Sequence, residues 1–334
     1  MIGVACNLGI LYTFAAMKVS ILVPVYGVEQ FIEPCAVSLF KQTYRDIEYI
    51  FVDDCTPDRS IEILKRVLQE YPRRQQQTRI IRHDHNCGLG AARLTATRAA
   101  TGEALMHVDS DDYVATNAVE LLVKQMEQTG ADIVDGGYAI VSKGVIKKKQ
   151  TPFHGAKETY LKTILCQNLV FNQIWARLIR RDLCIKHKVL SVEGVDYSED
   201  YCVVPRMLLD GERSWIDETT YYYRDDNSNS YTHSLNLKHH QSYLRSNRIV
   251  VEAFLQQDTS GRYRNAVEMS MLAVLRHARR FEVPLSFVDE LFPYQPKGFI
   301  AKGLWKLLRS PVPYPISEKI YRMARRIYFL SIHH

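Results

Sequence analysis

Two groups of acidic residues each follow a short apolar run, and their placement is the strongest chemical signal in the chain. The segment Asp109–Asp112 holds three aspartates behind the apolar run 104–108, and the pair Asp53–Asp54 follows the run 49–52. If both runs are strands of one parallel sheet, both groups lie at the edge where such sheets bind ligands. Carboxylate oxygens there suit Mg²⁺ or Mn²⁺, and such an ion suits a diphosphate. The alternative is a solvated acidic turn that caps the next helix.

The elements that must position these carboxylates alternate between strand and helix over the first 140 residues. Continuous apolar runs predict buried parallel strands, and apolar residues spaced three and four apart predict the helices between them. This alternation predicts an α/β fold with a mostly parallel sheet flanked by helices. The predicted strands are 19–23, 49–52, 78–82, 103–108 and 132–141, and the predicted helices are 29–42, 58–69, 90–100 and 116–128.

Beyond residue 150 the regular alternation ends. The lysines 147–149 suggest the tip of a hairpin, and the tyrosine-rich segment 219–224 predicts a strand. Amphipathic spacing predicts a helical appendage at the C-terminal end of the chain. Its helices are predicted over 237–256 and 265–281, while 157–168 and 172–186 are interpreted as helix or loop.

Four motifs, taken in their order and spacing, resemble the family 2 inverting glycosyltransferases of GT-A (Rossmann-like) fold, of the kind that builds bacterial surface polysaccharides. They are Val-Ser-Ile-Leu-Val-Pro-Val-Tyr at 19–26, Phe-Val-Asp-Asp at 51–54, Asn-x-Gly leading to Ala-Ala-Arg at 86–93, and Val-Asp-Ser-Asp-Asp-Tyr at 108–113. The resemblance is strong over about 17–140, weaker to about 235 and absent beyond 240. It implies a GT-A domain over 17–235, followed by a helical C-terminal region over 236–334.

The resemblance implies that the first two motifs bind the base and ribose of a nucleotide-sugar, with a UDP-sugar favoured. Pro24, Val25 and Tyr26 leave the first strand at the sheet edge, where Tyr26 can stack on a flat base. In similar enzymes the first acid of the second motif accepts a hydrogen bond from uracil, which assigns Asp53 to the base and Asp54 to the ribose side. The alternatives are a half-buried aromatic at a strand end and two helix-capping acids.

The third and fourth motifs are implied to hold the ribose, the diphosphate and a divalent cation. By resemblance Arg93 reaches the base or a phosphate, and a surface arginine is the alternative. Asp109 and Ser110 belong to the donor site, with Asp109 at the ribose. Asp111 is implied to hold Mn²⁺ or Mg²⁺ between the two phosphates, where the ion offsets charge on the departing UDP. Asp112 is a supporting or alternative ligand.

Inversion by direct displacement requires one general base on the acceptor hydroxyl. In this family the base belongs to a Glu-Asp pair in the second half of the domain, and Ser198-Glu199-Asp200 resembles that pair. We assign Asp200 as the base and Glu199 as its neighbour or substitute; the alternative is that the pair caps a helix. His233 lies in a segment that often closes over the diphosphate or metal in related enzymes, and we include it as a candidate metal ligand, with a loop histidine as the alternative.

The chain also departs from the family pattern at three loops. Cys55 fills a turn that is usually glycine, Gly27 replaces an asparagine, and Leu94 follows Arg93 where an asparagine is usual. These changes leave donor specificity open. A processive Gln-x-x-Arg-Trp motif is not found, which favours addition of a single sugar.

Two other classes of protein remain as alternatives. One is a sugar nucleotidyltransferase, although residues 24–28 lack the glycine-rich basic loop that it requires. The other is a catalytically inactive nucleotide-binding or membrane-docking scaffold.

Composition agrees with a protein of a reducing compartment. Hydrophobic residues make up 46% of the 334 residues and charged residues 24%, which is ordinary for a globular protein. The seven cysteines are scattered and include no C-x-x-C pair, which argues against a disulfide framework or a zinc site. We therefore expect a cytoplasmic protein.

The two ends of the chain differ from its body. From Gln295 onward, eight Lys/Arg stand against the single acid Glu318, so the tail is near +7 and the rest near −1. This basic amphipathic tail predicts contact with the inner face of the cell membrane, where a lipid-linked acceptor resides. The alternatives are a helix packed on the core or a homodimer contact; nucleic acid is not expected. Residues 1–16 are interpreted as a non-native or poorly ordered extension, or as a short anchor.

Overall fold

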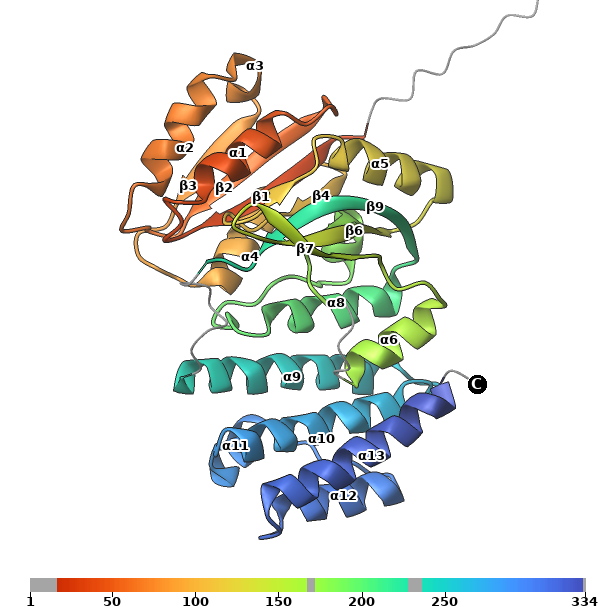
Figure 1. Ribbon diagram of the computed structural model, residues 1–334. Coiled ribbons are helices and arrows are strands. Elements are labelled where there is room, and N and C mark those ends of the chain that lie inside the picture. The colour runs from red at the N-terminus through yellow and green to blue at the C-terminus, as the bar shows by residue number, and fades with distance from the viewer. Residues whose placement is uncertain (1–16, 167–171, 228–235, 333–334) are drawn as a thin grey trace, which may run out of the picture.

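A nine-stranded sheet forms the upper part of the molecule, and helices cover both of its faces (Figure 1). The computed structural model describes residues 17–166, 172–227 and 236–332, so the predicted extension over 1–16 lies outside the described residues. The strands are β1 (Val19–Val25), β2 (Ile47–Asp53), β3 (Thr78–Arg82), β4 (Ala104–His107), β5 (Tyr113–Val114), β6 (Ile133–Ser142), β7 (Val145–Gln150), β8 (Arg177–Arg180) and β9 (Arg213–Arg224).

The helices alternate with the strands in the first half of the chain and follow one another in the last third. They are α1 (Ile32–Phe40), α2 (Ser60–Gln69), α3 (Pro72–Gln75), α4 (Leu89–Ala99), α5 (Ala118–Thr129), α6 (Lys157–Leu165), α7 (Arg181–Lys186), α8 (Glu199–Asp210), α9 (Leu237–Gln257), α10 (Arg264–Arg280), α11 (Leu285–Leu291), α12 (Phe299–Arg309) and α13 (Tyr314–Ile332).

The predicted α/β fold is confirmed, but the sheet is mixed rather than mostly parallel. The order is β3-β2-β1-β4-β8-β6-β9-β5, with β7 paired to β6. β3, β2, β1 and β4 are parallel, as predicted. β8 then runs antiparallel to both β4 and β6, while β9 is parallel to β6. Strand direction depends on how the chain connects the strands, and an apolar run carries no sign of it.

The packing of the first strand fixes the position of the sheet edge at its carboxyl end. All seven residues of β1 are buried, because helices cover both faces of the sheet. Val19, Ile21 and Val23 point into the apolar layer beneath α1, α2 and α5, whereas Leu22 points into the layer on the opposite face. This two-residue alternation fixes the register of β1 and therefore the place where its carboxyl end emerges.

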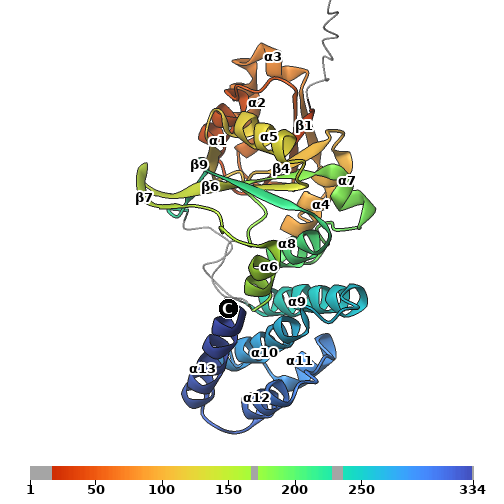
Figure 2. The ribbon, with the colours of Figure 1, turned by 90° about the vertical axis from the view of Figure 1, so that its right-hand side faces the viewer.

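The C-terminal helices share a hydrophobic core with the sheet. One continuous buried cluster joins Leu22 on the sheet, Ile164 in α6, Val204 in α8, Leu272 in α10 and Trp305 in α12. Figures 1 and 2 show α9–α13 stacked below α6 and α8, away from α1–α3. The boundary near residue 235 stays a prediction, and the two regions pack as one body.

Two local predictions in the middle of the chain are wrong. Lys147–Lys149 lies within β7, and the hairpin tip is Lys143-Gly144, where both residues have positive φ. A two-residue loop of that conformation matches the twist of the flanking strands. The lysines instead cover an exposed edge strand, which discourages pairing with another chain. The segment 172–186, interpreted as helix or loop, contains β8 as well as α7.

Candidate active site

A cleft of about 840 Å³ opens where β1, β2 and β4 end. This volume lies in the range of ligand pockets, roughly 300–1,000 Å³. One wall comes from the strand ends and α4, and the other from α8 and α9. Of the residues predicted for the site, Pro24, Val25, Tyr26, Asp54, Asp109, Ser110, Asp111, Glu199 and Asp200 line this cleft. Asp53 and Arg93 are buried and do not line it, and His233 lies outside the described residues.

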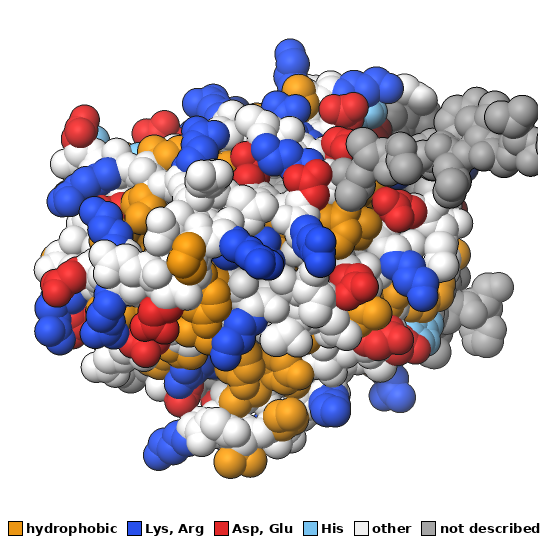
Figure 3. Space-filling model, turned by 90° about the horizontal axis from the view of Figure 1, so that it is seen from above, with side chains coloured by type: hydrophobic (Ala, Val, Ile, Leu, Met, Phe, Trp, Pro, Cys, Tyr) orange, Lys and Arg blue, Asp and Glu red, His pale blue; other side chains and the backbone are white. Residues whose placement is uncertain are grey.

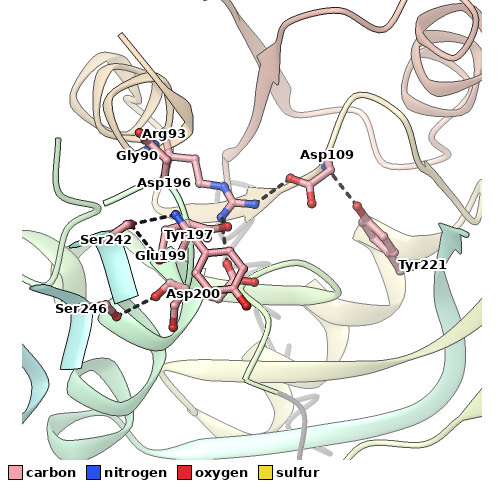
Figure 4. Close-up of polar contacts among 11 residues, drawn as sticks. Gly90, Arg93, Asp109, Asp196, Tyr197, Glu199, Asp200, Tyr221, Ser242 and Ser246 are labelled. Atoms are coloured by element: carbon pink, nitrogen blue, oxygen red, sulfur yellow. Dashed lines mark hydrogen bonds and ion pairs between the residues drawn. The ribbon is translucent and has the colours of Figure 1, made fainter. Parts of the chain in front are cut away.

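Arg93 joins the two walls of the cleft (Figure 4). Its guanidinium is buried, and its Nη2 donates to Asp109 at 2.7 Å. Its Nη1 donates to Glu199 at 2.7 Å and to Asp200 at 2.8 Å. The sequence predicted that this side chain reaches a base or phosphate; in the structure its two terminal nitrogens bond three carboxylates. The predicted contact with the donor therefore stays a prediction, and the structure adds a bridging role.

The charges around Arg93 do not balance, because three carboxylates share one guanidinium. Burial raises the pKa of Glu199, and the carboxylate of Asp200 raises it further. Burial also raises the pKa of Asp200, although Arg93 opposes that rise. Two neighbouring buried carboxyls share a proton more readily than they both ionise. Burial and mutual repulsion therefore oppose the simultaneous ionisation of both carboxyls.

Asp109 and Asp112 are tied to β9 through one tyrosine. The Tyr221 hydroxyl donates to Asp112 at 2.8 Å and accepts from the Asp109 backbone N–H at 3.1 Å. The other oxygen of Asp112 accepts from the Arg224 backbone N–H at 2.7 Å. Both oxygens of Asp112 are thus engaged, so this residue supports the turn. The predicted supporting role fits these contacts, whereas a ligand role would require both bonds to open.

Asp111 is a second carboxylate of this turn that lines the cleft. Its Oδ2 accepts from Asn227 Nδ2 at 2.8 Å. Burial raises the pKa of Asp111, and the neighbouring Asp109 carboxylate adds to the rise. A divalent cation relieves such repulsion, and hard carboxylate oxygens are the donors that Mg²⁺ and Mn²⁺ prefer. The donor set therefore fits the predicted ion.

The two acids at the end of β2 lie in different surroundings. Asp53, assigned to the base, accepts from the Thr56 backbone N–H at 2.8 Å beneath the surface. Asp54 reaches the cleft, and its carboxylate accepts from the backbone N–H groups of Cys87 and Gly88, each at 2.8 Å. Their roles toward a donor stay predictions. The observed contacts make Asp54 the residue that orders the loop before α4.

Asp54, His83 and Cys87 also form a group whose ligand atoms lie within 4.8 Å of one another. His83 Nδ1 lies 2.7 Å from Asp54, and its Nε2 lies 2.9 Å from the Thr95 hydroxyl. Because these hydrogen bonds already satisfy the ring and the carboxylate, we interpret the group as loop structure.

Tyr26 and Trp175 are two of the aromatic side chains that line this cleft. Tyr26 is 49% exposed at the end of β1. Trp175 lines the cleft and stacks on Tyr221, with ring centroids 4.5 Å apart. Arg177, two residues further on in β8, is buried, and its Nη1 donates to Asp135 at 2.7 Å.

Sequence reasoning missed several residues of the second wall. Asp196 accepts from the Gly90 backbone N–H at 2.9 Å, so it joins the start of α4 to the segment before α8. Lys238 and Tyr243 reach the cleft from α9, a region without family resemblance. Asp196 stands four residues before Asp200 in the sequence, so its nearness to the predicted base could have identified it. Nothing in the sequence marks Lys238 or Tyr243 as residues of the site.

Comparisons with known proteins show which proteins the chain resembles. The family model for Glycosyl transferase family 2 matches residues 20–187. The chain is 36% identical over 222 residues to the uncharacterized glycosyltransferase EpsJ of Bacillus subtilis, covering 64% of this chain and 62% of that protein. It is 26% identical over 211 residues to the poly(ribitol-phosphate) beta-N-acetylglucosaminyltransferase TarS of Staphylococcus aureus, covering 62% of this chain and 35% of TarS. The chain thus spans less than two thirds of either relative.

The solved structure of TarS residues 1–349 shows the same fold. It superposes with a TM-score of 0.65 at 18% sequence identity and covers 92% of both chains. The same TarS fragment has also been solved in complex with UDP-GlcNAc, and that structure superposes with a TM-score of 0.63. Most of the C-terminal helical region therefore lies within the superposed residues. This agreement supports the packing of that region and the sheet as one body.

We predict that Arg93→Met lowers the free energy of unfolding by about 3–5 kcal/mol at neutral pH, because the carboxyl groups of Asp109, Glu199 and Asp200 lose the buried cation that they share. The loss shrinks as the pH is lowered, since carboxyls whose pKa is raised in the folded state take up protons there. Urea unfolding at several pH values measures both effects. Arg66→Met is the control, because its ion pair with Glu33 is largely exposed and its loss costs less than about 1 kcal/mol. Equal effects of the two changes would contradict the bridging role.

Proposed function

Because the chain belongs to glycosyl transferase family 2, we propose that it moves a single sugar from a nucleotide-sugar to a glycan or lipid-linked acceptor in surface polysaccharide synthesis. The observation that carries the proposal is the bridge by which Arg93 holds Asp109 and the pair Glu199–Asp200 in one cleft. A UDP-sugar is favoured, since the TarS fragment of the same fold has been solved with UDP-GlcNAc. The relatives named as glycosyltransferases support the reaction class.

In the proposed reaction the acceptor oxygen attacks the anomeric carbon while the bond from that carbon to the diphosphate oxygen breaks. The electron pair leaves with the nucleoside diphosphate, and the hydroxyl proton passes to Asp200. Attack from the face opposite the leaving group inverts the anomeric configuration. Glu199 retains its proton because burial and the Asp200 carboxylate raise its pKa. The neutral Glu199 therefore leaves Asp200 as the available base.

We further propose that Asp111, with Asp109 beside it, holds a Mn²⁺ or Mg²⁺ ion at the turn after β4. When bound, the ion supplies positive charge for the departing diphosphate. Asp111 lies at the cleft wall, and the hydrogen bond from Asn227 orients its carboxylate. Tyr26 is proposed to stack on the base, and Asp54 to keep the loop before α4 in place for the ribose.

We predict that Asp200→Asn abolishes transfer while UDP affinity stays within about threefold, because the base is lost and the donor side is unchanged. Glu199→Gln is the matched control, because glutamine imitates the protonated acid, and we expect it to keep most of the activity. UDP release from UDP-GlcNAc and UDP-glucose, measured with and without poly(ribitol phosphate), compares the variants. Full activity in Asp200→Asn would move the base to Glu199. No turnover by the wild type with any donor and acceptor would favour the scaffold alternative.

The exposed face of α13 supports contact with an anionic membrane surface. Ile316, Ile320, Met323 and Ile327 follow helical spacing and are 36% to 63% exposed. The basic side chains Lys319, Arg322 and Arg326 lie on the same exposed side. Tyr321, in the same helix, is fully buried in the core. An apolar stripe between basic residues is the pattern of helices that lie in the headgroup region.

The end of the molecule opposite α13 differs from the exposed face of this helix. The face above α1–α3 and α5, seen in Figure 3, mixes basic and acidic side chains and shows no comparable single-signed stripe. No helix in the described part of the chain is long and apolar enough to cross a bilayer. We therefore propose that α13 lies on the membrane surface and brings the cleft to a lipid-linked acceptor.

We predict that the protein sediments with vesicles that contain about one-third phosphatidylserine and not with phosphatidylcholine alone, and that salt releases it. The double variant Met323→Glu/Ile327→Glu should lose this binding because it places two acids on the apolar face. Val145→Glu, at an exposed apolar position on β7, is the control and should bind normally. Vesicle binding that is unchanged in the double variant would contradict the proposal, and a dimer that this variant dissociates would assign the face to self-association.

A further inference from the structure

The turn that carries Glu199 and Asp200 has an unfavourable backbone conformation. Ser198, the residue before α8, has φ 65° and ψ 27°, in the left-handed region. A residue with a Cβ rarely adopts this conformation unless its surroundings hold it there. The first turn of α8 follows directly, so the φ of Ser198 sets the direction in which both carboxylates leave the helix. The surroundings of this turn therefore control the place of the proposed base.

Helix α9 holds this turn through two serine hydroxyls (Figure 4). The Ser242 hydroxyl accepts from the Tyr197 backbone N–H at 2.9 Å and donates to the Tyr197 carbonyl at 2.8 Å. The Ser246 hydroxyl donates to the Ser198 carbonyl at 2.7 Å. Residues four apart lie on one face of a helix. One face of α9 thus bonds the main chain of two consecutive residues.

The same face of α9 reaches further along the segment. Arg245 lies between the two serines, and its Nη1 donates to the Glu193 carbonyl at 3.0 Å. All of these bonds end on main-chain atoms of the segment before α8. Packing of α9 against its neighbours is provided by other side chains, such as Val250 and Phe254, which are fully buried. Apolar side chains thus pack α9 against its neighbours, while the serine hydroxyls bond the main chain of the segment.

The opposite side of the segment rests on the start of α4. Asp196 accepts from the Gly90 backbone N–H at 2.9 Å. A Cβ at Gly90 would lie 2.4 Å from the Val192 carbonyl oxygen and 2.5 Å from that of Val195, so only glycine allows this approach. The segment is thus enclosed between α4, which also carries Arg93, and α9.

We propose that Ser242 and Ser246 are positioning residues, which hold the Tyr197–Ser198 turn so that Glu199 and Asp200 meet Arg93 at the cleft. The inference rests on the proposed function, in which Asp200 is the base. It makes α9, in a region without resemblance to the family, a part of the active site. The serines contact no reacting atom in this account; they act through the backbone of the turn.

The test is the double variant Ser242→Ala/Ser246→Ala in the full chain. Loss of three hydrogen bonds frees the turn, and we expect kcat to fall roughly 10- to 100-fold, the scale of a catalytic group displaced by about 1 Å. The Kd for UDP should stay within about threefold. The activity readout uses whichever UDP-sugar the wild type turns over. Ser317→Ala is the matched control, because Ser317 is equally buried and its hydroxyl bonds the Tyr314 carbonyl at 3.0 Å on α13.

A second substitution separates positioning from general damage to the fold. Ser198→Gly, added to the double variant, should restore part of kcat, because glycine adopts the left-handed conformation without the steric cost of a Cβ. General destabilisation of the helices would not be relieved by this change. An unchanged kcat in the double variant, or a loss equal to that of Ser317→Ala, would overturn the inference, as would the absence of rescue.

Hydrogen exchange keeps the inference testable if the wild type turns over no UDP-sugar. In the wild type the Tyr197 amide is bonded to Ser242 and should exchange slowly. In the double variant it should exchange at least 10-fold faster, while amides in the centre of α10 stay protected. Fast exchange in the double variant, together with an inactive wild type, would support the positioning role of the serines and reject the proposed function. Slow exchange in the double variant would reject the positioning role of the serines, whatever the activity of the wild type.

Discussion

The arrangement of the cleft depends on the burial of one guanidinium among three carboxylates. A buried charge costs several kcal/mol unless its partners compensate it, so the fold must bring those partners to Arg93. They come from distant parts of the chain: Asp109 from the end of β4 and the Glu199–Asp200 pair from the start of α8. Because Arg93 must contact all three of these carboxyl groups, it sets the distance between the two walls of the cleft.

The other contacts of the site can be understood as support for that meeting. Tyr221 on β9 fixes the turn of Asp109 through Asp112, and Asp54 orders the loop that leads into the helix of Arg93. On the second wall, the hydroxyls of α9 and the carboxylate of Asp196 fix the approach to α8. The C-terminal helices belong to this support because they share one hydrophobic cluster with the underside of the sheet.

Much of the first wall was predictable from sequence, and little of the second. Buried parallel strands appear in the sequence as continuous apolar runs. The ends of β1, β2 and β4, and the acids at the ends of β2 and β4, were therefore located correctly. The partners of Arg93 were not predictable, because pairing across 106 or 107 residues leaves no local pattern. The left-handed Ser198 was missed for a similar reason: serine has no preference for that conformation, and only its tertiary contacts impose it.

The most direct test of the account is calorimetric titration of the wild type and Asp111→Asn with UDP, GDP and CDP, with and without Mn²⁺. The account predicts that UDP binds the wild type most tightly, that Mn²⁺ strengthens this binding, and that Asp111→Asn removes the effect of the metal. Absent binding of all three nucleotides, or binding that is indifferent to both Mn²⁺ and Asp111, would contradict the assignment of the cleft to a nucleotide-sugar donor.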